Sequence, residues 1–432
     1  MLGVGKAATR MGRKALVSLP AVVLVAGTGA LLPLGATVAD ASPMSAHVTL
    51  TVATTGSDTG NCQSKACKTL GYALTQAAPN DTILIRPGTY PESGNVNVVG
   101  PNLTGLSIRS TGSAARTVID ATGDANGILV QASGVSVTGL TVKNAQLEGI
   151  LAEPPLSSWP KTATAAAANI AHVTIAGNVV VNNDRAYDFA NPGDSACPSS
   201  LTDADDCGEG LHLLGVSWSK VTGNTVAHNV GGIMVTDGGF GISVGPAAHN
   251  LVAFNRISDN AFDCGITLPG HDARAVAKTG ADAGQPQPSL AGVYDNQIIH
   301  NVSTGNGGAG LLDATPYPGT GAYDNTFTGN DVSGNGNAGF TLHSHAPLQD
   351  VSGIVVTGNR FGKNNLDGDP DTGVTPTTGI MLLSAFVPTS ITVSNNFVFN
   401  DVNGIASNSN ITVSGHNAFV DVTNPSLSYT FP

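Results

Sequence analysis

The sequence predicts an all-β chain in which one short coil repeats many times. Gly accounts for 54 of the 432 residues, while charged residues make up only 11% and aromatic residues 5%. This composition, with its short apolar runs, favours strands and turns over helices. In addition, one short pattern recurs along the chain: a small or polar residue, then a Gly, then alternating apolar residues. The copies are NGILV (126–130), EGILA (148–152), EGLHL (209–213), GGIMV (231–235), CGITL (264–268), AGLLD (309–313), AGFTL (338–342), TGIML (378–382) and NGIAS (403–407).

The spacing of these copies indicates a solenoid. The shortest interval between their glycines is 22 residues and the longest is 61. About 22 residues suit three short strands with tight turns, each coil stacking on the next at about 4.8 Å. Longer intervals predict insertions at turns, which solenoids use for binding.

A second pattern places two Asn residues five positions apart, between the copies of the first pattern. Asn recurring at one turn would form a ladder, in which side-chain amides bond to one another and satisfy the backbone of the turn. The pairs are Asn178/Asn183, Asn224/Asn229, Asn255/Asn260, Asn296/Asn301, Asn325/Asn330 and Asn359/Asn364, with Asn396/Asp401 as a variant.

Together the repeats resemble the pectate-lyase-like superfamily of right-handed parallel β-helices, over roughly residues 80–425. The segment CKTLGYALTQAAPNDTILIRPGTYPE (67–92) is similar to the start of that fold, with a helix, a strand Thr82–Ile85 and a turn. A β-sandwich or a propeller fits the short, irregular period poorly. We therefore predict a single-stranded right-handed parallel β-helix with an N-terminal helix that caps the open end of the stack.

The N-terminus predicts export. Four basic residues precede an apolar stretch that ends in Ala39-Asp40-Ala41, the pattern of a cleaved signal peptide over residues 1–41. The alternative, a retained anchor, is disfavoured by the Pro and Gly residues that interrupt the stretch. The predicted organisation is then an N-terminal strand and capping helix over 42–80, and the β-helix over 81–432, with loop insertions at 152–209, 236–263, 269–309 and 343–378.

Charge narrows the classes of partner. Cleavage would remove four basic residues and one acidic residue, so the net charge of −12 becomes about −15. Nucleic acid is therefore excluded, since it requires a basic face. No later apolar run approaches the ~18 residues of a membrane span, which predicts a secreted protein without membrane attachment. The oligomeric state is left open.

The five cysteines divide by position. Export permits disulfides, and proximity favours the pairs Cys62/Cys67 and Cys197/Cys207. Cys264 remains, and we interpret it as a buried free thiol.

The stretch DDCGEGLHLLG (205–215) ends the longest interval and carries the first candidate site. Aligning the repeats places Leu211 in an inward column with Ile233, Ile266, Leu311 and Phe340, so His212 should point outward, toward the acids before it. Glycosidic hydrolysis needs two carboxyl groups, and stacked carboxyl groups can split their pKa values. The predicted catalytic set is Asp205, Asp206, Glu209, His212, Asp237, Asp263 and His271. The predicted substrate-binding set is Arg185, Trp218, Arg274, His343 and His345. The alternative is a solvated acidic loop with surface histidines.

Comparison with two types of enzyme in the superfamily qualifies this hypothesis. Asp205-Asp206-Cys207 before a strand is similar to polygalacturonases, which implies hydrolysis of a polyuronate. However, Gly270-His271 is followed by Asp272, and Arg256-Ile257-Ser258 lacks the expected Lys. Resemblance to pectate lyases implies β-elimination instead, with Ca²⁺ held by acids and Arg185 or Arg274 as the base.

One loop suggests a cofactor. DGDPDTG (367–373) places Asp367, Asp369 and Asp371 at alternate positions, as in calcium-binding loops. The Gly comes one residue late and the twelfth position is Thr378, so a polar turn is the alternative. Calcium is the one cofactor that the sequence suggests.

Two functions compete. The first is an enzyme that cleaves an extracellular polysaccharide as hydrolase or lyase, and the second is a non-catalytic carbohydrate-binding or cell-surface solenoid. A binder should expose aromatic residues that stack on sugars, but the chain holds only two Trp residues. The acid-rich insertion favours the enzyme.

Overall fold

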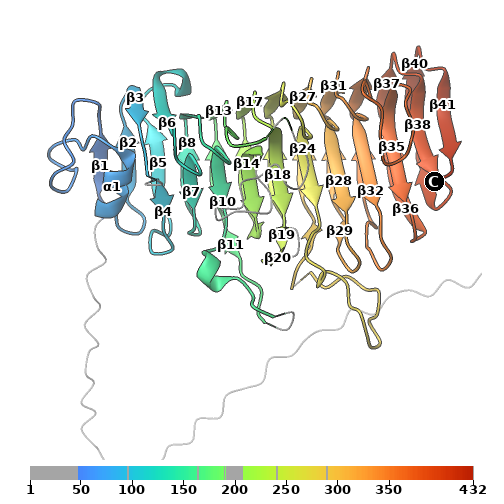
Figure 1. The fold of residues 1–432 in the computed structure, drawn as a ribbon, viewed down its shortest axis with the longest axis horizontal. Helices are drawn as coiled ribbons and strands as arrows, with labels where there is room; N and C mark the ends of the chain where they lie inside the picture. Colours follow the sequence, from blue (N-terminus) through green and yellow to red (C-terminus); the bar gives the residue numbers. More distant parts are fainter. Residues whose placement is uncertain are drawn as a thin grey trace, which may run out of the picture. The chain divides into compact units, whose positions relative to one another are not determined.

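The computed structural model describes residues 47–431 except 95–96, 163–164, 189, 191–207, 240–241 and 289. The predicted signal peptide therefore lies outside the described residues. From His47 onward the chain forms one compact unit, which is a stack of coils built on three long parallel sheets (Figure 1). Each coil visits the first, second and third sheet in turn. Parallel strands with right-handed crossovers make this the predicted right-handed parallel β-helix.

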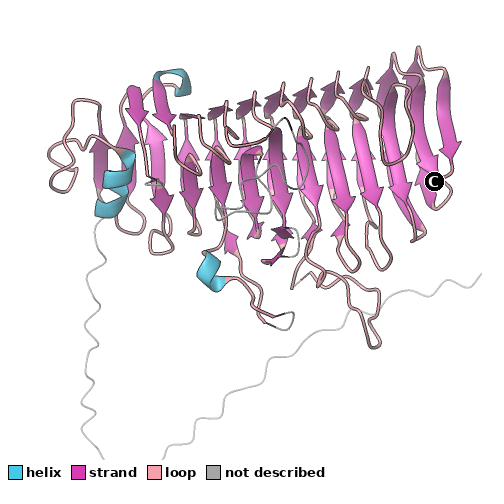
Figure 2. Ribbon diagram, viewed as in Figure 1, coloured by secondary structure: helices cyan, strands magenta, loops and turns pink. Residues whose placement is uncertain are grey.

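The strands are short, as three-strand coils of about 22 residues require (Figure 2). The first sheet comprises β1 (Thr49–Val52), β2 (Thr82–Ile85), β5 (Ser107–Ser110), β8 (Ser136–Thr138), β12 (Thr174–Ala176), β16 (Lys220–Thr222), β22 (Leu251–Ala253), β26 (Gln297–Ile299), β30 (Thr326–Thr328), β33 (Val355–Thr357), β36 (Thr389–Ser394) and β39 (Ile411–Ser414). The second comprises β3 (Gly88–Pro91), β6 (Thr117–Asp120), β9 (Thr141–Lys143), β13 (Val179–Val181), β17 (Thr225–Ala227), β23 (Arg256–Ser258), β27 (Val302–Thr304), β31 (Asp331–Ser333), β34 (Arg360–Gly362), β37 (Phe397–Phe399) and β40 (Ala418–Val420).

The third sheet carries the copies of the Gly pattern. It comprises β4 (Val98–Val99), β7 (Ile128–Val130), β10 (Ile150–Ala152), β14 (Glu209–Leu214), β18 (Gly231–Thr236), β24 (Ile266–Pro269), β28 (Leu311–Thr315), β32 (Phe340–Ser344), β35 (Thr378–Ser384), β38 (Asn403–Asn408) and β41 (Asn424–Tyr429). Short strands at the turns add β11 (Ile170–Ala171) with β15 (Val216–Ser217), β19 (Gly238–Gly239) with β20 (Ile242–Ser243), and β21 (Ala247–Ala248), β25 (Val293–Tyr294) and β29 (Ala322–Tyr323). The helical elements are α1 (Leu70–Gln76), η1 (Ala114–Arg116) and η2 (Leu156–Ser158).

The core follows the predicted inward column. Leu211, Ile233, Ile266, Leu311 and Phe340 pair in register on neighbouring strands of the third sheet, and each is at most 1% exposed. The residues that follow them, from His212 to Thr341, pair in the same register on the outer face. The third sheet therefore lines the core with one set of side chains and presents the other set outward.

The asparagines form ladders, but not at one turn as predicted. Asn255 and Asn301 belong to a ladder between the first and second sheets, in which each Oδ1 accepts the backbone N–H and the Nδ2–H of the Asn before it. Asn260 and Asn306 belong to a ladder between the second and third sheets. Asn296 accepts from Asn250, in a third ladder that precedes the first sheet. The five-residue spacing arises because a three-residue strand and a two-residue turn separate successive corners.

The N-terminal strand and helix are present as β1 and α1. Thr69 caps α1 by accepting the Tyr72 N–H, and the Glu92 carboxylate accepts the Leu70 N–H at 2.9 Å. That α1 acts as a cap of the stack stays a prediction. The predicted disulfide Cys62–Cys67 is confirmed, whereas Cys197 and Cys207 lie outside the described residues.

The four predicted loop insertions contain strands, because each interval between third-sheet strands also holds strands of the other two sheets. The range 343–378, for example, includes β33 and β34. The loops themselves lie at two corners, one before and one after the third sheet, and thus flank its outer face. In the described part of the chain, no helix has the length and apolarity needed to cross a membrane.

Candidate functional site

Three acidic and basic side chains meet at the N-terminal ends of β10 and β14. Glu148, Glu209 and His212 each offer a potential ligand or proton-carrying atom, and these atoms all lie within 4.8 Å of one another. His212 Nδ1 is 3.5 Å from Glu148 Oε1. All three side chains are buried, with at most 3% of each residue exposed. The predicted residues Glu209 and His212 therefore do come together.

The coil register explains this cluster. Ile150 pairs with Leu211, so Glu148 and Glu209 occupy the same position of successive coils, directly before the repeat Gly. Asp184 lies nearby and accepts the Val230 N–H at 2.8 Å. Burial, reinforced by the negative charge of Glu148, raises the pKa of Asp184 well above its usual range.

Asp263 approaches this cluster across Gly231. The Glu209 Oε1 atom would lie 3.1 Å from a Cβ atom on Gly231, and the Asp263 Cβ atom would lie 3.2 Å from it. The missing side chain thus leaves room for both acids. Because Glu209 pairs with Gly231 in the ladder, the two carboxyl groups come from coils on either side of it.

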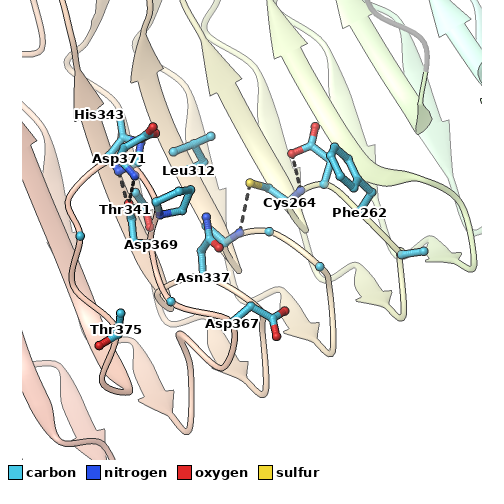
Figure 3. Close-up of a pocket in the computed structure, with 18 residues that line it drawn as sticks. Phe262, Cys264, Leu312, Asn337, Thr341, His343, Asp367, Asp369, Asp371 and Thr375 are labelled. Atoms are coloured by element: carbon cyan, nitrogen blue, oxygen red, sulfur yellow. Dashed lines mark hydrogen bonds and ion pairs between the residues drawn. The ribbon is translucent and has the colours of Figure 1, made fainter. Parts of the chain in front are cut away.

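A pocket of about 700 Å³ opens beside Asp263, between the residues directly before β24 and the strands β28 and β32. Figure 3 shows Cys264 and Phe262 at one end of it and His343 with Asp371 at the other. Leu312 and Thr341, from the outward column of the third sheet, line the pocket between these ends. The pocket therefore lies on the outer face, with polar groups at both ends.

His343 is held between two carboxylates of the loop 367–375. Its Nε2 is 3.2 Å from Asp369 Oδ2, and its Nδ1 is 3.2 Å from Asp371 Oδ2. Burial disfavours the imidazolium, but the hydrogen bonds and charges of both aspartates outweigh it and raise the pKa of His343 to about 9. Burial also raises the pKa of Asp369, but the hydrogen bond and charge of His343 outweigh it and lower the pKa overall. The hydrogen bond from His343 lowers the pKa of Asp371.

The predicted calcium residues do not share one centre. Asp369 Oδ1 accepts the backbone N–H groups of Asp371 and Thr372, each at 3.0 Å, which orders the loop. Among the described residues, the group of closely spaced ligand atoms contains Asp371 with His343 and His345, and neither Asp367 nor Asp369. In Figure 3, Asp367 points away from the other two. A calcium site of three aspartates stays a prediction that this arrangement does not favour.

Asp237 and His271 lie at the opposite end of the third-sheet strands. The strand from Gly231 to Thr236 separates Asp237 from Gly231 by about 20 Å. Asp237 accepts the N–H groups of His271 at 2.7 Å and Gly292 at 2.7 Å, so both its oxygens bind backbone. Burial and the charge of Asp272 raise the pKa of Asp237 to about 7. Burial lowers the pKa of His271 to about 4. These contacts favour a structural role for Asp237, at the far end of the strand from Glu209. His271 remains close enough to His212 for the charge of His212 to lower the pKa of His271 further.

The remaining predicted binding residues are dispersed. Arg274 is buried, its Nε donates to Asp272 Oδ1 at 3.0 Å, and its Nη1 donates to the Ala165 carbonyl at 3.2 Å, so it joins two loops. Arg185 is exposed and lines a separate pocket of about 430 Å³ with His228 and Asp259. Trp218 is 56% exposed at another corner.

Cys264 is a buried free thiol, as predicted. Its Sγ accepts the Ala309 N–H at 3.2 Å. Burial and the neighbouring Asp263 raise the pKa of the thiol well above its usual range, which suppresses the reactive thiolate.

Sequence reasoning missed Glu148 and the role of Asp369. The signal for Glu148 was present, since EGILA and EGLHL both place Glu before the repeat Gly. Asp205 and Asp206 lie outside the described residues, so their place in the site stays a prediction.

Comparison with known proteins gives structural likeness alone. Neither the protein-family models nor the curated proteins give a match. Among solved structures, the A-module of the Azotobacter vinelandii mannuronan C-5 epimerase AlgE4 is 13% identical, with 82% of this chain and 91% of that chain covered and a TM-score of 0.47. A polygalacturonase from Erwinia carotovora is 10% identical, with 87% and 96% covered and a TM-score of 0.46. The pectate lyase Pel9A is 14% identical, with 87% and 78% covered and a TM-score of 0.44.

Proposed function

We propose that this protein binds a polysaccharide along the outer face of the third sheet and cleaves a glycosidic bond there. The observation that carries the proposal is the approach of Glu209 and Asp263 to Gly231 from neighbouring coils, beside the large pocket. Acid/base cleavage of a glycosidic bond requires two carboxyl groups, and these two acids would supply them.

The two acids differ in environment, which suits different roles. Glu209 is buried, with 3% of the residue exposed. Asp263 is only half-buried and lines the open pocket. Glu209 therefore serves as the general acid that protonates the leaving oxygen, and Asp263 serves as the base or nucleophile. Glu148 and His212 hold Glu209 in a polar environment within 4.8 Å.

The pocket suits a sugar. Phe262 is 45% exposed and lines it, which provides an apolar face for stacking on a pyranose ring. Asn337 and Thr341 line the same pocket and offer hydrogen-bonding groups to hydroxyls. The parallel stack continues on both sides of the pocket, so an extended polymer can lie along it. With the signal peptide expected from residues 1–41, the substrate is an extracellular polysaccharide.

The test is turnover of a panel of neutral and acidic polysaccharides, followed by reducing ends and by the absorbance of unsaturated products. Glu209→Gln and Asp263→Asn should each lower kcat by at least about 100-fold, because each removes a proton-transfer group. Asp282→Asn, at an exposed turn remote from the pocket, is the matched control and should retain activity. Wild-type turnover that survives both site substitutions would remove these residues from the reaction.

One observation favours the alternative of a carbohydrate-binding protein. Trp218 stacks on His249 with ring centroids 3.9 Å apart, and His249 contacts Tyr294, which stacks on Tyr323. The row runs along successive coils, and Trp218 at its start is exposed and can stack on a sugar, whereas Tyr323 at its end is buried. Trp218→Ala should weaken binding of a glycan in a gel-shift assay if the row is the main site. If the panel gives binding that depends on Trp218 and no turnover, the binding function is the better description.

A further inference from the structure

We propose that His343, His345 and Asp371 form a binding site for a divalent transition-metal ion such as Zn²⁺ or Co²⁺. Their potential ligand atoms all lie within 4.8 Å of one another. The individual distances are 3.2 Å from His343 Nδ1 to Asp371 Oδ2 and 3.8 Å from His345 Nε2 to the same oxygen. A metal at typical bond lengths of about 2.0–2.2 Å from each atom requires only small side-chain movements.

The strand and the loop deliver the three donors from two directions. His343 lies in β32 and His345 directly follows the last residue of that strand, so this two-residue spacing directs both side chains to the same face. Their rings lie 5.1 Å apart and nearly perpendicular. Asp371 comes from the loop 367–375, which crosses this face. The three ligands therefore surround a point instead of lying in a row.

Asp369 supplies a second feature of metal centres. Its Oδ2 lies 3.2 Å from His343 Nε2, the ring nitrogen that faces away from Asp371. A carboxylate behind a metal-bound imidazole fixes the ring and the tautomer, and it raises the basicity of the ligating nitrogen. Asp369 is 2% exposed, and two backbone N–H groups hold its other oxygen, so it is positioned before any metal binds.

The loop is itself well held. Asp369 N–H donates to the Val374 carbonyl at 3.0 Å, and the Asn365 side chain donates to the carbonyls of Val374 and Pro376. A closed loop of this kind limits the entropy that Asp371 loses when it binds a metal.

Exposure differs across the three ligands, of which His343 and Asp371 line the pocket. The His343 side chain is 8% exposed, that of His345 is 30% exposed and that of Asp371 is 49% exposed. Three protein ligands with an accessible side leave a position for water or a substrate oxygen, as in catalytic metal sites. Two imidazoles and one carboxylate favour Zn²⁺, Co²⁺ or Fe²⁺ over Ca²⁺, which prefers six to eight oxygen ligands.

The test uses the full chain without a histidine tag, stripped of metal by a chelator. Isothermal titration with Zn²⁺ should give about one equivalent per chain, and Co²⁺ should give visible d–d absorption. His345→Ala and Asp371→Asn should each weaken Zn²⁺ binding by at least about 10-fold. Asp369→Asn should weaken it by about 10- to 100-fold without removing a ligand. His300→Ala, which removes an exposed histidine at another corner, should leave binding unchanged.

Thermal unfolding of the metal-free variants is the control for folding. A variant that binds no Zn²⁺ but has the melting temperature of the wild type has lost the metal site and kept the fold. The proposal is overturned if Zn²⁺ and Co²⁺ show no stoichiometric binding, if His345→Ala binds like the wild type, or if Ca²⁺ binds there in preference to Zn²⁺. These measurements need no glycan, so they succeed or fail independently of polysaccharide cleavage.

Discussion

At position 401 an aspartate takes a place in the ladder between the second and third sheets. Its Oδ1 accepts the Asn364 N–H at 3.1 Å, as an Asn would. An Asn in this ladder also donates through Nδ2 to a strand carbonyl of the preceding coil, as Asn364 does to Val332 at 3.2 Å. The buried Asp401 Oδ2 has no hydrogen-bond partner. Burial accordingly raises the pKa of Asp401 to about 7.

Asp401→Asn should stabilise the protein at pH 8. The equivalent carbonyl for its new Nδ2–H group is that of Phe361, two residues after Asn359 in the adjacent coil. Because the folded pKa is raised, the aspartate costs stability progressively between pH 4 and pH 7, and the full cost is present above pH 7. We expect about 1–3 kcal/mol of stabilisation at pH 8 and a smaller difference at pH 4. Urea unfolding at the two pH values measures it. An equal difference at both would show that the ladder carboxyl does not titrate.

Individual polar residues divide into those that repeat and those that do not. Glu148 could be predicted, since it repeats the position of Glu209 one coil earlier. The contact between Asp369 and His343 could not, because it depends on how a non-repeating loop folds back over β32. Asp237 was predicted at the acidic site, although it follows β18. Aligning the turns of successive coils does not show that residues before and after a third-sheet strand lie at opposite ends of that strand.

The repeat glycines explain how each coil enters the third sheet. A Cβ atom on Gly310 would lie 2.1 Å from Val332 Cγ1, 2.8 Å from Asn335 Nδ2 and 2.9 Å from the Gly339 carbonyl oxygen. Here the backbone passes directly over the core valine and the ladder Asn of the next coil. The Gly in each copy is therefore required by close approach and not by a left-handed backbone conformation.

Gly310→Ala should destabilise the stack more than Gly358→Ala. Gly358 lies at a first-to-second-sheet corner with φ of +65° and has nothing within 4 Å of its Cβ position, so Ala there meets only backbone strain. We expect about 1 kcal/mol for Gly358→Ala and about 2–3 kcal/mol for Gly310→Ala, which also displaces packed neighbours. Chemical denaturation compares the two. Equal losses would mean that the core relaxes around the new methyl group.

The strand elements were predictable because their period is fixed by the coil. The corners that hold the asparagines were harder to predict, because a spacing of five residues fits either pair of adjacent corners. Asn296/Asn301 and Asn301/Asn306 satisfy it equally, and only the hydrogen bonds of the stacked coils distinguish them.

Several carboxyl groups are buried in different coils of the molecule, and their burial disfavours the ionised form. Asp313 points inward from β28, where its Oδ2 accepts the Asn325 Nδ2–H at 3.0 Å and its Oδ1 has no hydrogen-bond partner. Burial raises its pKa well above the usual range. Burial also raises the pKa of Glu92 and that of Asp237 to about 7. The folded state binds protons at these carboxyl groups more tightly than the unfolded chain does, so their protonation favours folding.

The free energy of unfolding should consequently be greater near pH 5 than at pH 8.5. An acid whose folded pKa exceeds its unfolded value binds more protons in the folded state, so stability falls as the pH rises from about 4 through the folded pKa. Asp184, Asp313 and Asp401 act in this direction together with Glu92 and Asp237, and increasing net negative charge adds to it. His271 and His345 oppose them, because their lowered pKa values remove stability below about pH 6.5, whereas the raised pKa of His343 adds to the decline above that pH.

Urea unfolding of the full chain at pH 5, 7 and 8.5 tests this balance. Asp401→Asn and Asp313→Leu should each make stability fall less steeply with pH, because each removes one titrating group. Their effects should add, since the two carboxyl groups belong to different coils and bond to different asparagines, Asn364 and Asn325. Asp282→Asn, which changes an exposed carboxylate, should leave the slope as it is. A stability that rises from pH 5 to pH 8.5 would show that the buried carboxyl groups are ionised and compensated in the folded state, and would contradict the raised pKa values of these groups.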